Sequence, residues 1–228
     1  MDAVRSTATG SQTLARGLRA LELVAEATDG LTVQDLAGRL DVHRSIASRL
    51  LTTLADFRLV IRTPDGRYRA GSGLAALAAG IQGTLRAAAE PVMHELAAEL
   101  GATVSLLVVE GQEAVALAVV EPPGASYVLS FRTGSRHPLE RGSAGAALLA
   151  AGPADGDERA AVSEARARGY ASTFGEVEPG AYGVAVPLPP RAGLPAACLN
   201  LITHRADVAE SAAPALVTAA ERITQNLG

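Results

Sequence analysis

A short stretch of the chain, DVHRSIASRLL at residues 41–51, combines arginine and hydroxyl side chains that could bind nucleic acid. Guanidinium groups donate to phosphate oxygens or to the major-groove edge of guanine, and hydroxyl groups reach a base edge or a phosphate. Two alternatives remain open, namely that Arg49 braces the backbone of an earlier helix and that His43 merely starts its own helix. The candidate residues on this stretch and just after it are His43, Arg44, Ser45, Ser48, Arg49 and Thr52.

The apolar residues of the same stretch predict which way these side chains point. Ile46, Leu50, Leu54 and Phe57 recur at helical spacing, which is typical of the buried side of a helix. The arginine and hydroxyl residues would then lie on the outer face, free to enter a groove of a duplex.

Two further helices are predicted ahead of this segment. SQTLARGLRALELVAEA has a helical stripe that begins with Leu14 and Leu18. The sequence TVQD is typical of a capping box in which Thr32 and Asp35 cap each other's backbone N–H groups. A second helix would follow and end before the three-residue turn at residues 41–43.

A hairpin is predicted after the third helix. LVIR, TPDG and RYRAG indicate a strand, a tight turn and a strand, with Tyr68 facing inward. Arg67 and Arg69 would then point together toward the DNA backbone or the minor groove. Three helices and a hairpin within residues 13–71 predict a winged helix-turn-helix, whose third helix lies in the major groove.

Charge is distributed unevenly along the chain, whose formal net charge is −4. Residues 1–71 hold ten arginines against eight acidic residues, a net of +2, and residues 72–228 hold ten against sixteen, a net of −6. Residues 39–69 alone hold seven arginines and three aspartates, a net of +4. This distribution excludes a protein that coats nucleic acid along its whole surface and favours contact near residues 41–51.

Composition also indicates the compartment. The single cysteine, Cys198, leaves no intramolecular disulfide and favours a reducing cytoplasm. No apolar run approaches the roughly 18 residues of a membrane span. Residues 1–12 lack the apolar region of a secretory signal and are expected to form a disordered arm. We therefore expect a cytoplasmic protein without a membrane partner.

The rest of the chain indicates a linker and a second domain. Leu74, Leu77, Ile81 and Leu85 form an apolar stripe, so residues 72–84 are predicted to be a linker helix. The stripe indicates either a dimer contact or packing onto the following domain. Strand-like runs interleaved with helices over residues 85–228 predict a mainly antiparallel α/β domain. SYVLSFRTGS at 126–135 is predicted as one strand, and DVAESAAPALVTAAERITQNLG as one closing helix.

One segment of this second domain suggests a ligand. ERGSAGAALLA places Gly142, Ser143 and Ala144 at the start of a helix, where Ser143 can cap and small residues leave backbone N–H groups accessible. Such a start favours an anion, for instance a carboxylate. The alternative is that these small residues let the helix pack tightly on the sheet. Asn200, within an apolar strand, needs a partner if it is buried, and backbone, water or ligand could supply it.

No catalytic centre is predicted. The four histidines, at positions 43, 94, 137 and 204, lack metal-ligand spacing, and neither a GxSxG motif nor a lysine for a phosphate loop is present. Neither a metal nor a cofactor is therefore expected. An enzyme with a fused winged helix would need a convergent pair of groups, such as Glu176 with His137.

The chain resembles the IclR family of bacterial transcriptional regulators over about Thr13 to Leu227. The first half matches through LARGLRALELVAE and LTVQDLAGRLDVHRSIASRLLTTLADFRLVIRTPDGRYRAG, and the second through RTGSRHPLERGSAGAALLA and RGYASTFGEVEPGAYGVAVPLPPRAGLPAACLNL. The resemblance implies an α+β protein, in which a linker helix joins a winged helix-turn-helix to a GAF-like effector-binding domain at 85–228.

The resemblance also implies partners. Double-stranded operator DNA is bound by homodimers, often paired into homotetramers, and a small metabolite, commonly a carboxylate or aromatic acid, changes the affinity for the operator. The effector site would take Gly142, Ser143, Ala144, Glu176 and Asn200. The usual Gly-Leu before the third helix is Asp41-Val42 here, so Asp41 would adopt a left-handed conformation. A regulator of transcription, a repressor or an activator, is the function expected. A constitutive repressor with a decayed effector site is the alternative.

Overall fold

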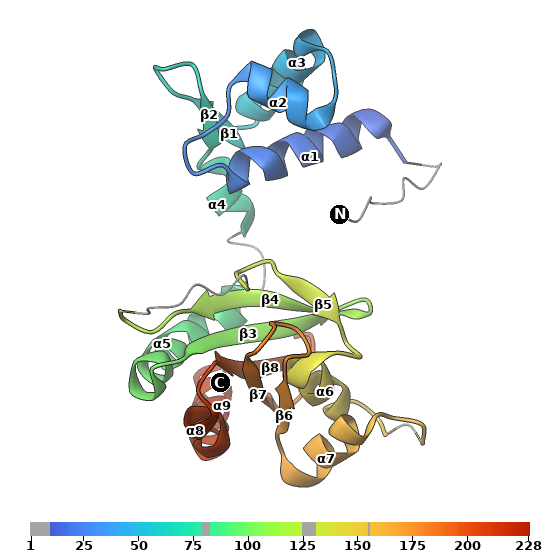
Figure 1. The fold of residues 1–228 in the computed structure, drawn as a ribbon, viewed down its shortest axis with the longest axis vertical. Helices are drawn as coiled ribbons and strands as arrows, with labels where there is room; N and C mark the ends of the chain where they lie inside the picture. The colour runs from blue at the N-terminus through green and yellow to red at the C-terminus, as the bar shows by residue number, and fades with distance from the viewer. Residues whose placement is uncertain (1–9, 79–82, 125–130, 155) are drawn as a thin grey trace. The chain divides into compact units, whose positions relative to one another are not determined.

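The structure is a computed structural model, and it describes residues 10–78, 83–124, 131–154 and 156–228. The chain divides into two compact units, Met1–Ile81 and Gln82–Gly228, which are described separately (Figure 1). Over the described residues, the first unit holds three helices, a hairpin and the short helix α4 (Gly73–Ala78), and the second is an antiparallel sheet with helices on both faces. The predicted fold class, a winged helix-turn-helix followed by an α/β domain, is confirmed.

The first unit is built from short elements with well-defined caps. α2 begins with the predicted capping box, in which the Asp35 N–H donates to Thr32 Oγ1 at 3.1 Å and the Thr32 N–H to Asp35 Oδ2 at 3.0 Å. It ends at Asp41, whose φ of 51° is left-handed as predicted. The elements are, in order, α1 (Gln12–Glu26), α2 (Val33–Leu40), α3 (Arg44–Asp56), β1 (Val60–Arg62), β2 (Tyr68–Ala70) and α4 (Gly73–Ala78).

The buried side of α3 differs from the prediction. Ala47, Leu51 and Leu54 face the core, whereas Ile46 is 39% exposed and Phe57 is 71% exposed. A small residue at position 47 allows α3 to approach its neighbours closely, which a side chain as large as isoleucine would prevent. The prediction was therefore wrong for Ile46 and Phe57 and correct for Leu54.

The same shift occurs on α1. Its core residues are Ala20, Leu23 and Val24, whereas Leu14 and Leu18 are 62% and 53% exposed. The predicted stripe continues to Leu21 and Val24; Val24 is buried and Leu21 packs against the core, so only Leu14 and Leu18 lie outside the buried face. Large apolar side chains at the surface call for a different explanation, such as contact with another molecule.

The hairpin is fixed to the helices by backbone pairing. β1 and β2 are antiparallel, and Leu31, in the loop before α2, exchanges backbone hydrogen bonds of 3.0 and 2.7 Å with Tyr68. Tyr68 is buried, as predicted. This isolated bridge fixes the loop before α2 beside the wing.

The second unit is a six-stranded sheet in the order β5-β4-β3-β8-β7-β6, with every pair antiparallel. α5, α8 and α9 cover one face and α6 and α7 the other (Figure 1). Every residue of the central strand β8 is buried. The elements are α5 (Gly83–Leu100), β3 (Thr103–Glu110), β4 (Glu113–Val120), β5 (Arg136–Pro138), α6 (Gly142–Ala150), α7 (Ala160–Arg168), β6 (Ala171–Phe174), β7 (Tyr182–Pro187), β8 (Ala197–Thr203), α8 (Ala206–Ser211) and α9 (Ala213–Asn226).

Three predictions for the linker and the second unit need correction or fall partly outside the described residues. The predicted strand at 126–135 lies outside them up to residue 130, and residues 131–135 form no strand. The closing segment forms two helices, because Pro214 lacks the N–H that would continue α8. In the linker stripe, Ile81 is outside the described residues, and Leu85 packs into the core of the second unit.

Two predicted domain boundaries differ from the ends of helices. Residues 1–9 of the predicted arm lie outside the described residues, and α1 begins at Gln12. The predicted start of the second domain, residue 85, falls within α5. Among the helices that the structure describes, none is long and apolar enough to cross a bilayer.

Candidate functional site

The outer face of α3 presents the predicted polar residues to solvent. Arg44, Ser45, Arg49 and Thr52 are exposed, and Ser48 is half-buried. One row of side chains lies on the side of the helix away from Leu51, because its members are separated by four and then three residues. The row consists of Ser45, Arg49 and Thr52. Although the buried face was predicted incorrectly, the row of arginine and hydroxyl groups is available to a partner.

His43 has a local role at the start of α3. Its Nδ1 accepts a hydrogen bond from the Ser45 N–H at 3.3 Å and lies 2.8 Å from Ser45 Oγ. His43 is therefore the N-cap of α3, which supports the alternative that it starts the helix. It is also exposed, so the ring remains accessible beside the row.

The hydroxyl of Thr52 forms a hydrogen bond within its own helix. Its hydroxyl donates to the carbonyl oxygen of Ser48 at 3.0 Å. The hydroxyl oxygen can still accept a hydrogen bond, but its proton is used. The Ser45 hydroxyl is likewise engaged, 2.8 Å from His43 Nδ1, so Arg49 retains more capacity to contact a base edge than either hydroxyl does.

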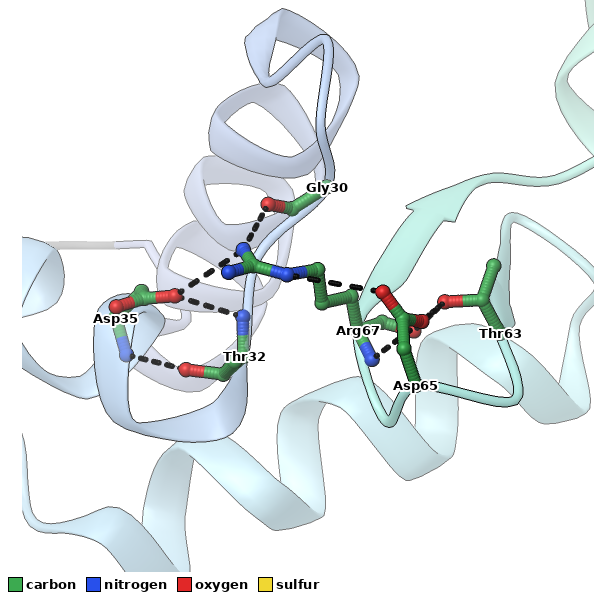
Figure 2. A network of polar contacts seen from close by, with 6 residues as sticks. All are labelled: Gly30, Thr32, Asp35, Thr63, Asp65 and Arg67. Atoms are coloured by element: carbon green, nitrogen blue, oxygen red, sulfur yellow. Dashed lines mark hydrogen bonds and ion pairs between the residues drawn. The ribbon is translucent and has the colours of Figure 1, made fainter.

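Arg67 and Arg69 behave differently from each other, although both side chains begin beside Gly30. Arg67 Nη1 donates to the Gly30 carbonyl oxygen at 3.1 Å and lies 3.8 Å from Asp35 Oδ2. Its Nε lies 3.8 Å from Asp65 Oδ2, as Figure 2 shows. The guanidinium of Arg67 thus joins the wing to the start of α2, and its predicted contact with DNA stays a prediction. Arg69 is exposed, as its predicted role requires.

The two acids around Arg67 have pKa values below their usual range. Hydrogen bonding to the backbone of Thr32 is the main reason for the lowered pKa of Asp35, and Arg67 adds to it. The Thr63 hydroxyl is the main cause of the lowered pKa of Asp65, with a further contribution from Arg67. Both carboxylates stay ionised at neutral pH, so the network in Figure 2 is a charged one.

The five residues predicted for an effector site line one pocket in the second unit, between α6, the β6–β7 hairpin and β8. The cavity volume is about 30 Å³, which is enough for a water molecule but small beside typical ligand pockets. The lining residues are Phe131, His137, Gly142, Ser143, Ala144, Thr173, Glu176, Val177, Glu178, Ala181, Tyr182, Gly183, Asn200 and Ile202.

Ser143 and Asn200 are bound to each other at the base of this pocket. Ser143 Oγ donates to Asn200 Oδ1 at 2.8 Å, and Asn200 Nδ2 donates to Ser105 Oγ at 3.3 Å. Both predicted residues are buried. Side chains therefore supply the partners of Asn200, and the expectation of backbone, water or ligand was wrong. Ser143 does not cap α6, because the N-cap is Arg141, without a capping side chain.

Glu176 occupies the helix start that was expected to be open. The Gly142 N–H donates to Glu176 Oε2 at 2.7 Å, and Arg159 Nη1 lies 3.3 Å from the same oxygen. The guanidinium of Arg141 donates to the backbone carbonyl of Glu176. The prediction of an accessible N–H at position 142 is corrected: a carboxylate of the chain itself is bound there.

Several pocket residues were not predicted as ligand contacts. His137, considered only for an enzyme, is 7% exposed, and its Nδ1 lies 3.0 Å from the carbonyl oxygen of Pro138. Thr173, Val177 and Tyr182 reach the pocket from the β6–β7 hairpin. Strand alternation could have placed Thr173 and Gly183, which are direct partners, on one face of the sheet, but nothing local in the sequence places that face against α6.

The single cysteine of the chain lies buried in β8. Burial strongly raises the pKa of the Cys198 thiol, so it stays protonated. Within the described ranges, no three His, Cys, Asp or Glu side chains are grouped so that they could hold a metal ion.

Comparison with known proteins gives a consistent result for both halves. The IclR helix-turn-helix domain model matches residues 13–64, and the bacterial transcriptional regulator IclR C-terminal model matches residues 81–162. HTH-type transcriptional regulator Rv1719 of Mycobacterium tuberculosis is 32% identical over 155 residues, which are 68% of this chain and 60% of that protein. The Pca regulon regulatory protein of Pseudomonas putida is 26% identical over 94% of this chain and 83% of its own length.

A solved structure agrees with these matches. The IclR homolog from Microbacterium hydrocarbonoxydans, complexed with 4-hydroxybenzoate, has a TM-score of 0.75 and 26% identity, covering 94% of this chain and 98% of that one. The family models, the relatives and the fold point to one assignment. The chain belongs to the IclR family of bacterial transcriptional regulators.

Proposed function

We propose that this regulator binds double-stranded operator DNA through the outer face of α3 and the wing. The observation that carries the proposal is the exposed row of Ser45, Arg49 and Thr52, held outward by the burial of Ala47 and Leu51. Arginine and hydroxyl groups on a helix of this size match the donors that read a major groove. Arg69 on the wing adds a cation for the DNA backbone.

A salt-titrated binding assay on the promoter region of its own gene tests this proposal. Arginine contacts to phosphate release counterions, so log K should fall linearly with log salt, by about 0.9 for each phosphate contacted. An affinity that does not depend on salt or on DNA sequence would contradict the proposal.

The effector is proposed to be a small carboxylate that binds in the pocket at α6 and changes the affinity for the operator. Gly142, Ser143, Ala144, Glu176 and Asn200 all line this pocket, which supports their assignment to the site. The similar protein from Microbacterium hydrocarbonoxydans was crystallised with 4-hydroxybenzoate, an aromatic carboxylate. Thermal-shift screening of small acids, followed by operator binding with each hit, tests this part. A screen in which no acid alters operator affinity would contradict it.

The active species is proposed to be a homodimer, which can pair into a homotetramer. Leu14 and Leu18 are large, exposed and on one side of α1, which supports a self-association surface there. Two copies related by a twofold axis would match a palindromic operator. A cytoplasmic location is proposed too, and the buried free thiol of Cys198 and a DNA partner both support it.

A regulator without an effector is the second candidate. The little space in the pocket and the internal bonds of Glu176 favour it. Constant operator affinity in the presence of every small acid, together with no thermal shift, would support this alternative. The pocket also contains titratable groups, Glu176, Glu178 and His137, as an enzyme would need, but the relatives named above are regulators.

A further inference from the structure

The hairpin between β6 and β7 places a carboxylate of the chain in the pocket. The Gly175 N–H donates to the Ala181 carbonyl oxygen at 2.8 Å and closes the hairpin tip. Glu176, Val177 and Glu178, all on this tip, line the pocket. The tip is thus the part of the pocket wall that carries acidic groups.

The carboxylate of Glu176 is held in the manner of a bound anion. Its Oε2 accepts from the Gly142 N–H at 2.7 Å and lies 3.3 Å from Arg159 Nη1. A backbone N–H at a helix start, together with a guanidinium, is a favourable environment for a carboxylate. Nothing in this arrangement requires the carboxylate to belong to the protein.

Arg159 has donors that Glu176 leaves unused. Its Nε and Nη2 are buried and have no hydrogen-bond partner among the described residues. Buried donors are normally paired, and a guanidinium can bind both oxygens of a carboxylate in parallel. Arg159 therefore has more hydrogen-bond donors than the one that now lies near Glu176 Oε2.

The pocket offers a second unused polar atom. His137 is 7% exposed, and because Nδ1 lies 3.0 Å from the Pro138 carbonyl oxygen, Nδ1 carries the proton. Nε2 is then an acceptor, and it has no hydrogen-bond partner in the described part of the chain. This acceptor could receive a hydroxyl proton from a small molecule that enters beside Gly142.

Van der Waals contact closes the same space. A Cβ atom added at Gly142, where φ is 75°, would lie only 2.6 Å from Val177 Cγ2. The hairpin tip thus rests directly on the start of α6, with Val177 and Glu176 both seated there. A molecule larger than water could reach the Gly142 N–H only if the tip moved.

We propose that Glu176 is an internal occupant of the effector site, and that an external carboxylate binds by replacing the Glu176 carboxylate at Gly142 and Arg159. This inference rests on the proposed function of the pocket and adds its regulation. The chain holds the site closed until an acid of sufficient affinity competes with Glu176. The apparent affinity for the acid is then the intrinsic affinity multiplied by the small fraction of molecules in which the site is free.

Chemical rescue of the full-length chain tests the replacement. Glu176→Ala removes the internal carboxylate, so sodium acetate should raise the melting temperature of this variant, at ionic strength matched with sodium chloride. The half-maximal acetate concentration should be roughly tenfold or more below that of the unsubstituted chain, given the strength of charge-assisted hydrogen bonds. Acetamide, which has the same shape without the charge, should have no comparable effect.

Glu178→Ala is the matched control, because Glu178 lines the same pocket and its loss changes the net charge equally. If Glu178→Ala responds to acetate as strongly as Glu176→Ala, general electrostatics explains the gain and the inference is overturned. Should Glu176→Ala fail to fold, Glu176→Gln against Glu178→Gln carries the same comparison, with a smaller expected gain. Equal acetate responses in that pair would also overturn it.

A second measurement keeps this result separate from the proposed function. Operator binding of the unsubstituted chain is measured with and without acetate and benzoate. Acetate rescue of Glu176→Ala without any effect of acid on operator affinity would support internal occupancy and contradict the effector role. An effect of acid on operator affinity without acetate rescue of Glu176→Ala would support the effector role and contradict internal occupancy.

Discussion

The Nη1 atom of Arg67 donates a hydrogen bond to the carbonyl oxygen of Gly30 at 3.1 Å, joining the wing to the loop before α2. The same guanidinium lies between Asp35 and Asp65, at 3.8 Å from each carboxylate (Figure 2). The position of the wing therefore depends on a residue whose own charge is already compensated within the fold.

Arg67→Gln should lower the affinity for the operator by displacing the wing, while leaving the salt dependence of binding nearly unchanged. It should also destabilise the first unit by about 1 kcal/mol, since the contacts are partly exposed. Arg69→Gln, the matched control, should leave stability unchanged and reduce the salt slope by about one. Titrations of operator binding against salt measure the affinity and the salt slope of both variants. A reduced slope in Arg67→Gln would show that Arg67 contacts phosphate directly.

Ser45→Ala and Arg49→Ala should each weaken operator binding by about 1–3 kcal/mol, the typical cost of a lost base contact. Both side chains are exposed on α3, so thermal unfolding should be unchanged. Arg19→Ala on α1 controls for the loss of one positive charge. If the affinity of both α3 variants equals that of the unsubstituted chain, the assigned row of α3 is not the reading surface.

The capping box of α2 should weaken in acid. The pKa of Asp35 is lowered below 3.8 in the folded state, so its stabilising contribution is complete above that value and is lost as pH falls through the folded pKa. Hydrogen exchange of α2 amides should therefore be faster in Asp35→Asn than in the unsubstituted chain at neutral pH. The two should converge once the pH is well below 3.8, where Asp35 is protonated in the folded state too. A difference that persists there would assign the effect to packing.

Ser143→Ala should destabilise the second unit by about 1–3 kcal/mol, because it leaves Asn200 Oδ1 buried and unpaired. Chemical denaturation monitored by circular dichroism measures the loss. Ser163→Ala, at an exposed serine of α7, is the control and should have little effect. Equal stability of the two variants would mean that water replaces the lost hydroxyl.

Leu18→Asp should shift the chain from dimer to monomer in sedimentation velocity and reduce operator affinity. The reason is that Leu18 is 53% exposed next to Leu14, and a charge there would be desolvated in an α1-mediated dimer. Arg19→Ala changes the net charge of α1 by the same amount and should remain dimeric. An unchanged sedimentation coefficient for Leu18→Asp would place self-association elsewhere.

The local chemistry of the first unit could be predicted from the sequence, whereas the orientation of its helices could not. The capping box and the left-handed Asp41 depend on neighbouring residues, and both are present as predicted. The buried face of α3 depends on how closely helices approach, which favours Ala47 over the larger Ile46. Large aliphatic residues alone therefore misidentified the core.

In the second unit, the residues of the pocket were easier to predict than their bonds. The motifs that matched the family placed Gly142 and Glu176 in one site, and the structure brings them together. Their hydrogen bond joins residues 34 positions apart through the geometry of a hairpin tip, which no local period in the sequence encodes. The sequence therefore predicted a helix start open to an anion, and in the structure the Glu176 carboxylate is hydrogen-bonded there.

The hydrogen bonds from Ser143 through Asn200 to Ser105 tie α6 to two adjacent strands, β8 and β3. The opposite face of β3 packs against α5, the first helix of the second unit. A displacement of α6 would therefore act on β8 and β3 together and not on one helix alone. If the proposed effector moves α6, its effect would reach α5 through β3.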